Sequence, residues 1–292
     1  MVQEKTSSMS SALLSEVLLT DRHFKHLSEF IHSICGIKLP ASKKTMLEGR
    51  LRKRLRALGI RSFDEYCRYL QSSEGMTLEC VHMVDVVTTN KTDFFREPAH
   101  FEYLVNTGLP ELAVSKGAGV RSRLRTWSAG CSTGEEPYTL AMVLSEFART
   151  CPGFQFSILA TDISTAVLQT ARKAIYPHDR IDPVPMPLRK KYLLKSKDKA
   201  RGLVRISPEL RSRVTFQRIN FMDSNFGIRQ PMDIIFCRNV LIYFDRPTQE
   251  MVLRQFCHHL NPGGFLFTGH SETLQNMRLP VEQVSASVYK RL

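Results

Sequence analysis

The sequence predicts an α/β fold: a mostly parallel sheet flanked by helices, preceded by a smaller all-helical domain and interrupted by a small inserted subdomain. Beyond residue 101, short apolar or alternating segments typical of strands take turns with segments of helical apolar spacing. This order indicates right-handed βαβ units and a parallel sheet. Before residue 90, apolar residues keep helical spacing and show no strand-like alternation.

The N-terminal part is expected to form an all-helical domain over residues 21–90, after a flexible N-terminus over residues 1–20. Its predicted helices cover residues 21–34, 43–58, 63–71 and 77–87. Glycine or proline lies between each helix and the next, as is typical of helix ends. Residues 91–110 are expected to be a linker to the second domain.

The second domain, residues 111–292, holds the predicted sheet. Its strands are expected at residues 121–128, 154–161, 214–219, 232–237, 265–269 and 286–291, and its helices at residues 138–149, 164–175 and 248–260. Segment 232–237 is short and apolar throughout, as expected for a strand that is covered on both faces. The segment Asn261-Pro-Gly-Gly264 favours the end of the last helix.

Residues 176–213 separate the second helix of this domain from its third strand. We interpret them as an inserted subdomain with one strand at 202–206. The stretch is first rich in proline and then very basic, and residues 171–213 carry 13 basic and 4 acidic side chains. They supply most of the formal net charge of +13. Such a patch favours an acidic partner without identifying it.

Composition excludes several classes of protein. The apolar stretch at residues 12–19 is short and contains Ser15 and Glu16, so it predicts neither a membrane-spanning helix nor a signal peptide. The seven cysteines are scattered without a C-x-x-C pair, so neither a disulfide framework nor a metal site is predicted. Reduced thiols fit a cytoplasmic protein.

A glycine-containing turn follows the first predicted strand, with the sequence Trp127-Ser-Ala-Gly-Cys-Ser-Thr-Gly-Glu-Glu-Pro137. Gly130 and Gly134 would let the backbone approach a ligand at the carboxyl edge of the sheet. The carboxylates of Glu135 and Glu136 would repel a phosphate but suit a ligand with an ammonium or sulfonium group. The alternative is an ordinary strand-to-helix turn, in which acidic residues favour the helix dipole.

Polar residues also follow the second and fourth predicted strands. Asp162 closes the second strand, where a carboxylate can accept both hydroxyls of a ribose. Its alternative role is a helix cap. Arg238 and Asn239 follow the fourth strand, which should lie beside the first strand at the switch point where ligands bind. The alternative is a buried strand that runs into a loop.

Two further segments have competing interpretations. Residues 89–97 join the two domains, and their plainest role is a linker with Thr92 or Asp93 as a helix cap and a solvated Arg96. Helix 43–58 places four leucines on one stripe, namely Leu47, Leu51, Leu55 and Leu58. Its other side is basic and carries Arg50, Arg52, Lys53 and Arg56. A solvated face and a binding surface for acidic helices both fit this pattern.

From about residue 21 to residue 289, the chain resembles the chemotaxis-receptor methyltransferases, the CheR-type family. The resemblance is carried by five motifs together: T-T-N-x-T-x-F-F-R-E, S-T-G-E-E-P-Y, D-I, F-C-R-N-V-x-I-Y-F and G-H-S-E. The resemblance implies an all-helical N-terminal domain and a class I S-adenosylmethionine-dependent methyltransferase domain, Rossmann-like with a mostly parallel seven-stranded sheet. It implies methyl transfer from S-adenosylmethionine to glutamate side chains of chemotaxis receptors, which gives glutamyl methyl esters and S-adenosylhomocysteine.

The resemblance also implies roles for individual residues. The cofactor-binding set is Asn90, Thr92, Arg96, Glu136, Asp162, Asn220, Phe221, Arg238 and Asn239. Arg96 and Tyr243 would lie beside the reactive methyl group as catalytic residues. The receptor-binding set on the basic helix is Arg50, Lys53, Arg54 and Arg56. In some members the inserted subdomain binds the receptor's C-terminal tail, but the proline run at 182–187 and the basic tract at 189–201 depart from the family pattern.

This chemistry needs no general base. A sulfonium methyl group is already activated, and a glutamate carboxylate, with an ordinary pKa of about 4.3, is deprotonated near neutral pH. Catalysis then consists of in-line positioning and desolvation of two charged groups. Arg96 is expected to hold the incoming carboxylate with its guanidinium fork. Tyr243 is expected to orient that carboxylate or to exclude water.

Two other functions compete with this one. The net charge of +13 fits a nucleic-acid methyltransferase. However, the fourth strand is followed by Arg238-Asn-Val-Leu241 instead of the D/N-P-P-Y/F tetrad of enzymes that methylate base amino groups. The sequence also lacks the Pro-Cys dipeptide that carries the nucleophile of cytosine C5 methyltransferases. The other competitor is a non-catalytic scaffold that binds the cofactor or a receptor. The preferred interpretation is a cytoplasmic, monomeric enzyme that neither binds nucleic acid nor inserts into a membrane.

Overall fold

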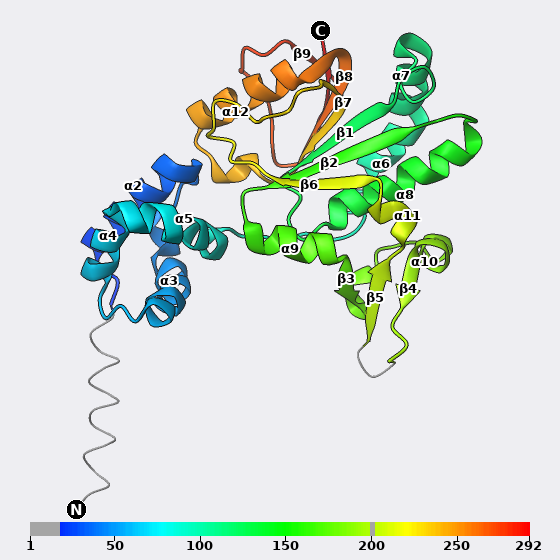
Figure 1. Ribbon diagram of the computed structural model, residues 1–292. Helices are drawn as coiled ribbons and strands as arrows, with labels where there is room; N and C mark the ends of the chain where they lie inside the picture. Colours follow the sequence, from blue (N-terminus) through cyan, green and yellow to red (C-terminus); the bar gives the residue numbers. More distant parts are fainter. Residues whose placement is uncertain (1–17, 199–201) are drawn as a thin grey trace, which may run out of the picture. The chain divides into compact units, whose positions relative to one another are not determined.

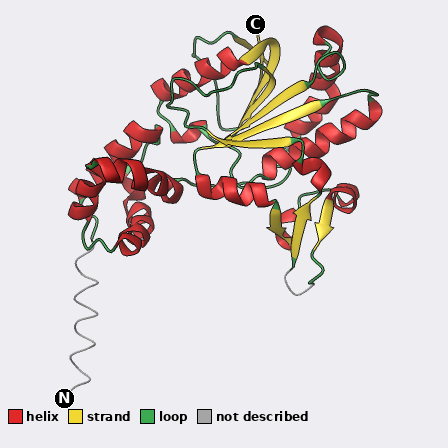
Figure 2. Cartoon of the chain, viewed as in Figure 1, coloured by secondary structure: helices red, strands yellow, loops and turns green. Residues whose placement is uncertain are grey.

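The computed structural model describes residues 18–198 and 202–292, which form two compact units, one ending at Thr89 and the other beginning at Asn90 (Figure 1, Figure 2). Most of the flexible N-terminus expected over residues 1–20 therefore lies outside the described residues. Within the described residues, no helix is both long and apolar enough to cross a membrane.

The first unit is all-helical, as the sequence predicts. Its helices are α2 (Asp21–Cys35), α3 (Lys44–Leu58), α4 (Phe63–Gln71) and α5 (Ser73–Val87), with a 3-10 turn at Ala41–Lys43. The hydroxyls of Thr20, Ser62 and Ser72 accept hydrogen bonds from N–H groups in the first turns of α2, α4 and α5. Gly36 and Gly59 end α2 and α3 in the left-handed conformation. Local capping chemistry therefore sets most of these boundaries.

Helix α5 begins before the predicted residue 77 because Gly75 does not break it. Ser72 caps the helix, and Gly75 lies within its first turn. A Cβ at Gly75 would lie 1.9 Å from the carbonyl oxygen of Tyr69. The glycine therefore allows α4 and α5 to approach closely and does not end a helix.

Buried leucines form much of the core of this unit. Leu47, Leu51 and Leu55 of the predicted stripe are buried on α3, together with Leu27 and Ile31 of α2. Leu58, the last residue of α3, is only partly buried. The predicted apolar face of α3 is therefore confirmed except at its end.

Glu79 of α5 is a buried carboxylate with 1 % of its surface exposed. Its oxygens accept hydrogen bonds from Arg54 Nε at 2.9 Å, from Arg54 Nη2 at 2.6 Å and from the Tyr66 hydroxyl at 2.9 Å. A buried charge is tolerated when it is paired and hydrogen-bonded. This network therefore joins α3, α4 and α5.

The second unit contains a seven-stranded sheet in the order β6-β2-β1-β7-β8-β10-β9. Its strands are β1 (Leu124–Ala129), β2 (Phe156–Asp162), β6 (Val214–Arg218), β7 (Met232–Cys237), β8 (Leu260–Thr268), β9 (Val281–Ser285) and β10 (Val288–Arg291). The first five strands in this order are parallel, and β10 is antiparallel to both of its neighbours. The predicted fold class is therefore confirmed.

Two strands differ from the prediction near the end of the chain. Strand β9 is missing from the prediction because it lies at the sheet edge with its residues exposed or partly exposed, so its sequence lacks the alternation that one buried face imposes. Strand β8 begins at Leu260 because Asn261–Gly264 continues the strand, whereas the sequence predicts only the end of a helix there.

Helices cover both faces of the sheet (Figure 1). Helices α8 (Glu135–Thr150) and α9 (Thr165–Lys173) contribute to the core on one face, and α12 (Arg246–His259) contributes to the core on the other. The connection from β6 to β7, residues 219–231, forms no helix. That connection covers part of its face as an irregular segment, with Phe221 and Phe226 buried in the same core as α12.

Residues 91–110 do not form a linker. They contain α6 (Ala99–Tyr103), which continues through a π-helical turn (Leu104–Gly108) into α7 (Leu109–Lys116). Phe101 and Leu104 are buried in the same core as α8. The segment belongs to the second unit because these apolar side chains pack into that core.

The insertion forms a three-stranded antiparallel sheet in the order β3-β5-β4. Its elements are β3 (Ile175–Pro177), a 3-10 turn (His178–Ile181), α10 (Met186–Tyr192), β4 (Leu193–Lys195), β5 (Leu203–Ile206) and α11 (Pro208–Arg211). The strand expected at 202–206 is therefore present as β5. Tyr176, Val204 and Ile206 join the core that contains α8, so the insertion packs on the sheet domain.

The buried network in the first unit predicts that Glu79→Ala lowers the free energy of unfolding by about 3 kcal/mol, because it leaves the Arg54 guanidinium without its partner. Chemical denaturation of the full chain, followed by circular dichroism, measures the change. Glu74→Ala, at an exposed position of the same helix, is the matched control and should cost less than about 0.5 kcal/mol. Equal costs for the two variants would contradict the importance of this network.

Candidate active site

The carboxyl ends of β1, β2 and β7 lie at one edge of the sheet, and polar residues gather there. Strand β1 lies between β2 and β7, so the order of the strands reverses beside it. The glycine turn after β1, Asp162 after β2 and Arg238 after β7 therefore share this edge, as the sequence predicts.

The turn after β1 needs glycine at two places. Gly130 has a φ of 83° and Gly134 a φ of 99°, both in the left-handed region. A Cβ at Gly130 would lie 2.4 Å from Val240 Cγ2, and one at Gly134 would lie 2.8 Å from the Tyr176 hydroxyl oxygen. Neighbouring chain segments thus approach the turn more closely than a side chain would allow.

Asp162 is buried at the end of β2, and each of its oxygens accepts a backbone hydrogen bond. The Ser132 N–H donates to Oδ2 and the Ser164 N–H to Oδ1, both at 2.9 Å. Ser164 is the residue that caps α9, since its hydroxyl accepts from the Val167 N–H. The two bonds orient the Asp162 carboxylate, and a carboxylate has about four acceptor positions in all.

The two adjacent glutamates at the start of α8 have different environments. Glu135 is 1 % exposed, and its oxygens accept from Arg180 Nη2 at 2.9 Å and from the Thr133 hydroxyl at 2.6 Å. The Glu135 carboxylate is therefore already paired with Arg180, which belongs to the insertion. The interpretation that both glutamates face a cationic ligand does not hold for Glu135.

Glu136 points to the other side, toward β1 and β7. Its Oε1 accepts from the Ser128 hydroxyl at 2.7 Å, and its Oε2 lies 3.3 Å from Arg238 Nη1. Burial raises the pKa of Glu136, although Arg238 opposes that shift. A second cation beside Glu136 would favour its charged form further.

Arg238 is a buried cation, with 2 % of its side chain exposed. Its guanidinium lies 3.1 Å from Glu97 Oε2 and 3.3 Å from Glu136 Oε2, and it also donates to the Arg96 carbonyl. The ring of Phe101 lies 5.5 Å away, within cation–π range. Arg238 therefore joins the loop before α6 to the start of α8.

Asn239 has an acceptor without a partner. Its φ of 58° is left-handed, which asparagine adopts more readily than most residues. Its backbone N–H donates to Glu272 Oε2 at 2.9 Å, and its Nδ2 lies 3.4 Å from Glu97 Oε1. Its Oδ1 is buried and accepts no hydrogen bond from the described residues. Because a buried acceptor without a donor is costly, this oxygen indicates a place for a donor from a ligand.

Glu272 has a structural role that the sequence does not indicate. Its carboxylate accepts from the backbone N–H groups of Asn239 at 2.9 Å, Gly269 at 2.6 Å and Ile242 at 3.2 Å. Burial raises the pKa of Glu272, although these hydrogen bonds act to lower it. The motif G-H-S-E contains Glu272, but no spacing in the sequence indicates that it fastens the loop after β7.

Segment 90–97 is fixed to the second unit by hydrogen bonds and is not a free connection. The Ser132 hydroxyl donates to the Asn90 carbonyl at 2.9 Å, and Arg180 Nη2 donates to the Thr92 carbonyl at 2.7 Å. Asp93 lies 3.3 Å from Arg180 Nη1. No helix begins at Thr92 or Asp93, so the cap interpretation is wrong for both.

The backbone is strained on both sides of Arg96. Phe95 has a φ of 53° and Glu97 a φ of 54°, which are unfavourable for residues with a Cβ. The half-buried side chain of Arg96 donates from Nη1 to the Lys91 carbonyl at 3.1 Å. Strain of this kind is concentrated at functional sites in proteins, so the segment is a candidate part of the site.

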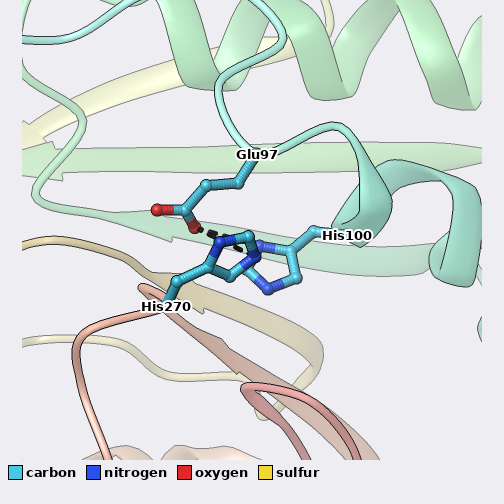
Figure 3. Close-up of side chains that lie close together, drawn as sticks. All are labelled: Glu97, His100 and His270. Carbon is cyan, nitrogen blue, oxygen red and sulfur yellow. Dashed lines mark ion pairs between the residues drawn. The ribbon is translucent and has the colours of Figure 1, made fainter.

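Glu97, His100 and His270 form a compact group here (Figure 3). Their potential ligand atoms lie within 4.8 Å of one another, close enough for a metal ion to bridge after small shifts. However, Glu97 Oε2 already lies 3.1 Å from Arg238, and that guanidinium would repel a bound cation. Burial lowers the pKa of His100 to about 4, so its ring is neutral at pH 7. We assign the group to the network around Arg238.

The remaining site residues lie after β6 and β7. Phe221 is buried and packs against Trp127 and Phe256, so it has a role in the core that the sequence analysis does not give it. Asn220 Oδ1 accepts from the Met222 N–H at 3.1 Å. Tyr243 is half-buried at the end of a 3-10 turn.

The four basic residues assigned to receptor binding divide into two pairs. Arg50 donates to the carbonyls of Val87 and Thr88 at 2.7 and 3.0 Å, and Arg54 is paired with the buried Glu79. Lys53 and Arg56 are exposed. The structure therefore uses Arg50 and Arg54 within the first unit and leaves Lys53 and Arg56 on its surface.

Known proteins match this chain over nearly its whole length. Residues 22–88 match the family described as CheR methyltransferase, all-alpha domain, and residues 90–290 match CheR methyltransferase, SAM binding domain. The chain belongs to the CheR methyltransferase family. The resemblance carried by the sequence motifs is therefore confirmed.

Curated relatives of the chain are chemotaxis protein methyltransferases. That of Borreliella burgdorferi is 38% identical, over 94% of this chain and 95% of the relative. That of Escherichia coli is 37% identical, over 93% and 91%. Chemotaxis protein methyltransferase 2 of Pseudomonas aeruginosa is 38% identical, over 92% and 93%. The chain is thus an S-adenosylmethionine-dependent methyltransferase.

The residues at the sheet edge fit S-adenosylmethionine. That cofactor carries an ammonium, a sulfonium and two ribose hydroxyls, and the site offers mainly acceptors: the carboxylates of Glu136 and Asp162 and the unpartnered Oδ1 of Asn239.

The pairing of Glu97 predicts a pH-dependent stability. Burial alone would raise its pKa, but Arg238, with help from His270 and Asn239, lowers the pKa below the ordinary value of 4.5. A lowered carboxylate pKa adds stability above the ordinary pKa, and that stability is lost as the pH falls through the folded-state pKa. We therefore expect Glu97→Gln to lower the melting temperature at pH 7 and to have a shrinking effect below pH 4.5.

Calorimetric melting temperatures of the unaltered chain and the variant, measured across this pH range, test the expectation. Glu102→Gln, at an exposed position of α6, is the control and should show little difference at any pH. A deficit of Glu97→Gln that stays constant down to pH 4 would show that Glu97 does not act through its charge.

Proposed function

We propose that the chain transfers the methyl group of S-adenosylmethionine to glutamate side chains of chemotaxis receptors and forms γ-glutamyl methyl esters. The observation that carries this proposal is the match of residues 90–290 to the SAM-binding domain of CheR methyltransferases. Relatives named chemotaxis protein methyltransferases support a receptor substrate. The acceptor-rich site at the edge of the sheet supports the cofactor.

Three residues of the cofactor set, namely Glu136, Asp162 and Asn239, each have one partner on the cofactor in this proposal. Glu136 takes the ammonium group, since it is a carboxylate whose charged form a cation favours. Asp162 takes the ribose hydroxyls with a carboxylate that two backbone N–H groups orient. Asn239 Oδ1 accepts from the methionine end, which is the donor that this buried oxygen lacks.

The other members of the set border the cofactor on two sides. Asn220 and Phe221, which follow β6, lie beside the adenine. Asn90 and Thr92 line the cofactor from segment 90–97, whose carbonyls are held by Ser132 and Arg180. Arg238 supports the site indirectly, because it fixes Glu136 and the Arg96 carbonyl.

Arg96 and Tyr243 position the receptor glutamate. Bound S-adenosylmethionine supplies a methyl group that its sulfonium already activates, so the protein needs to align and desolvate the attacking carboxylate. Arg96 has five N–H donors and uses one on Lys91, which leaves donors for a carboxylate. If Arg96 bound the carboxylate too tightly, it would stabilise the ground state and slow methyl transfer. Tyr243 orients the carboxylate and limits access of water.

The receptor meets the enzyme at two further places in this proposal. Lys53 and Arg56 on α3 contact the acidic helices of the receptor, while Arg50 and Arg54 support that helix from inside. The small sheet of the insertion binds the receptor's C-terminal tail. This second contact is supported by Ile175 and Leu194, which are exposed on the two outer strands with Arg205 between them.

The same proposal places the chain in the cytoplasm as a monomer, where seven free cysteines remain reduced and the cytoplasmic domains of receptors are accessible.

Removal of Arg96 tests the catalytic assignment. We expect Arg96→Ala to lower turnover about 100-fold, equivalent to about 2.7 kcal/mol of transition-state stabilisation, with little change in melting temperature. The measurement is transfer of labelled methyl to receptor-containing membranes, followed by alkaline release of volatile methanol. Arg149→Ala, an exposed arginine on α8, is the control. Near-normal turnover of Arg96→Ala would refute its role, and alkali-stable label or transfer to added RNA would refute the glutamate ester.

Charge reversal on α3 tests the receptor surface. The double variant Lys53→Glu with Arg56→Glu should raise KM for receptor membranes about tenfold at low salt and leave kcat nearly unchanged, because exposed charges mainly affect association. The control variant is Arg22→Glu with Lys25→Glu, at exposed positions of α2. A similar rise in KM for both variants would contradict the assignment, because net charge, and not the surface formed by Lys53 and Arg56, would then determine receptor binding.

A further inference from the structure

The sheet face that carries α12 is open only in part: a groove lies beside the first residues of β1 and β2 and along β6, whereas Trp127 further along β1 is buried. Parallel sheets ordinarily have both faces covered and apolar. Here the connection from β6 to β7, residues 219–231, forms no helix that could cover these strands. The groove has a volume of about 670 Å³ and is lined by strand residues and by part of that connection. None of its lining residues belongs to the candidate active site.

Several side chains that line the groove are polar where a covered sheet would be apolar. The strand register places Arg125 beside Ser157 and Leu159 beside Thr215, and Gln217 follows on the same face of β6. Thr215 and Gln217 are exposed, and Ser157 is partly exposed. The face is therefore suited to contact with a polar partner.

Three arginines give the groove its charge. Arg123, Arg125 and Arg229 line it, and its lining residues include no acidic side chain. None of the three guanidinium groups is in an ion pair with the described residues. The carboxylate of Asp233 accepts from the backbone N–H of Arg125 and from the Asn261 amide, at 2.8 and 2.9 Å, and not from these guanidinium groups.

We propose that this groove binds an acidic polypeptide segment in an extended conformation. Arg123 and Arg125 are two residues apart where the chain enters β1, so their side chains lie on one side of the chain, about 6.6 Å apart. Acidic residues at alternate positions of an extended peptide have the same repeat. A guanidinium pairs with a carboxylate through two parallel hydrogen bonds, and Thr215 and Gln217 offer further polar partners.

A nucleic acid fits the groove less well than an acidic peptide. Single-stranded nucleic acids bind through stacking on aromatic side chains in addition to charge. The lining residues include no aromatic side chain. The charge of the groove without a stacking surface therefore favours carboxylates over nucleotides.

Fluorescence anisotropy of a labelled (Glu-Ser)4 peptide with the full chain tests the proposal. The groove variant carries Arg123→Gln, Arg125→Gln and Arg229→Gln. The control variant loses the same charge at three exposed positions elsewhere in the second unit: Lys116→Gln, Lys173→Gln and Arg278→Gln. Melting temperatures verify folding. If the triple groove variant does not fold, the single variant Arg229→Gln, at an exposed position of the connection, decides the question.

We expect the triple groove variant to weaken binding at least about tenfold, the single variant about threefold and the control less than twofold, and a (Gln-Ser)4 peptide not to bind. Equal losses in groove and control variants would overturn the proposal, because net charge would then explain binding. Equal binding of the two peptides would also overturn it. An RNA oligonucleotide of equal charge that binds more tightly through the same arginines would replace it with a nucleic-acid site. The test measures peptide binding alone, so its outcome does not depend on the methyl-transfer activity proposed above.

Discussion

The buried charge of Arg238 is the constraint on which the site depends. A guanidinium with 2 % of its surface exposed is stable only where carboxylates and carbonyls take the place of water. Glu97 supplies one carboxylate from the loop before α6, and Glu136 supplies another from the start of α8. Three distant segments of the chain must therefore converge before this charge is compensated. The same convergence brings the Arg96 carbonyl to Arg238 and the Asn239 amide to Glu97, so the charge balance and the geometry of the site arise together.

The sequence predicts the elements that local chemistry determines. The helices of the first unit begin at capping hydroxyls such as that of Ser62 and end at glycines such as Gly59. Both signals can be recognised from the amino-acid sequence alone. The apolar strand β7 is predicted with its observed bounds for a similar reason. Gly75 is misinterpreted because its role is a close contact between helices. The helical segment after Pro98 is missed because only its burial against the sheet reveals its place in the second unit.

The site is predictable to the extent that topology fixes it. Asp162 and Arg238 are found from their positions at strand ends, because parallel strands bring their carboxyl ends to one edge. The division between Glu135 and Glu136 is not predictable, since it depends on Arg180 reaching across from the insertion. Glu272 is not predicted for a similar reason, because two of its three backbone partners, Asn239 and Ile242, lie in a loop about 30 residues away. Pairings between remote segments leave no periodic trace in the sequence.

Arg180 also restricts how the insertion can be exchanged between relatives. It lies in the 3-10 turn after β3 and binds Glu135, Asp93 and the Thr92 carbonyl at 2.9, 3.3 and 2.7 Å. A transplanted insertion without this arginine would leave Glu135 as a buried, uncompensated carboxylate at the start of α8. An exchanged insertion would therefore have to keep this turn as well as the contacts of Val204 and Ile206 with the core.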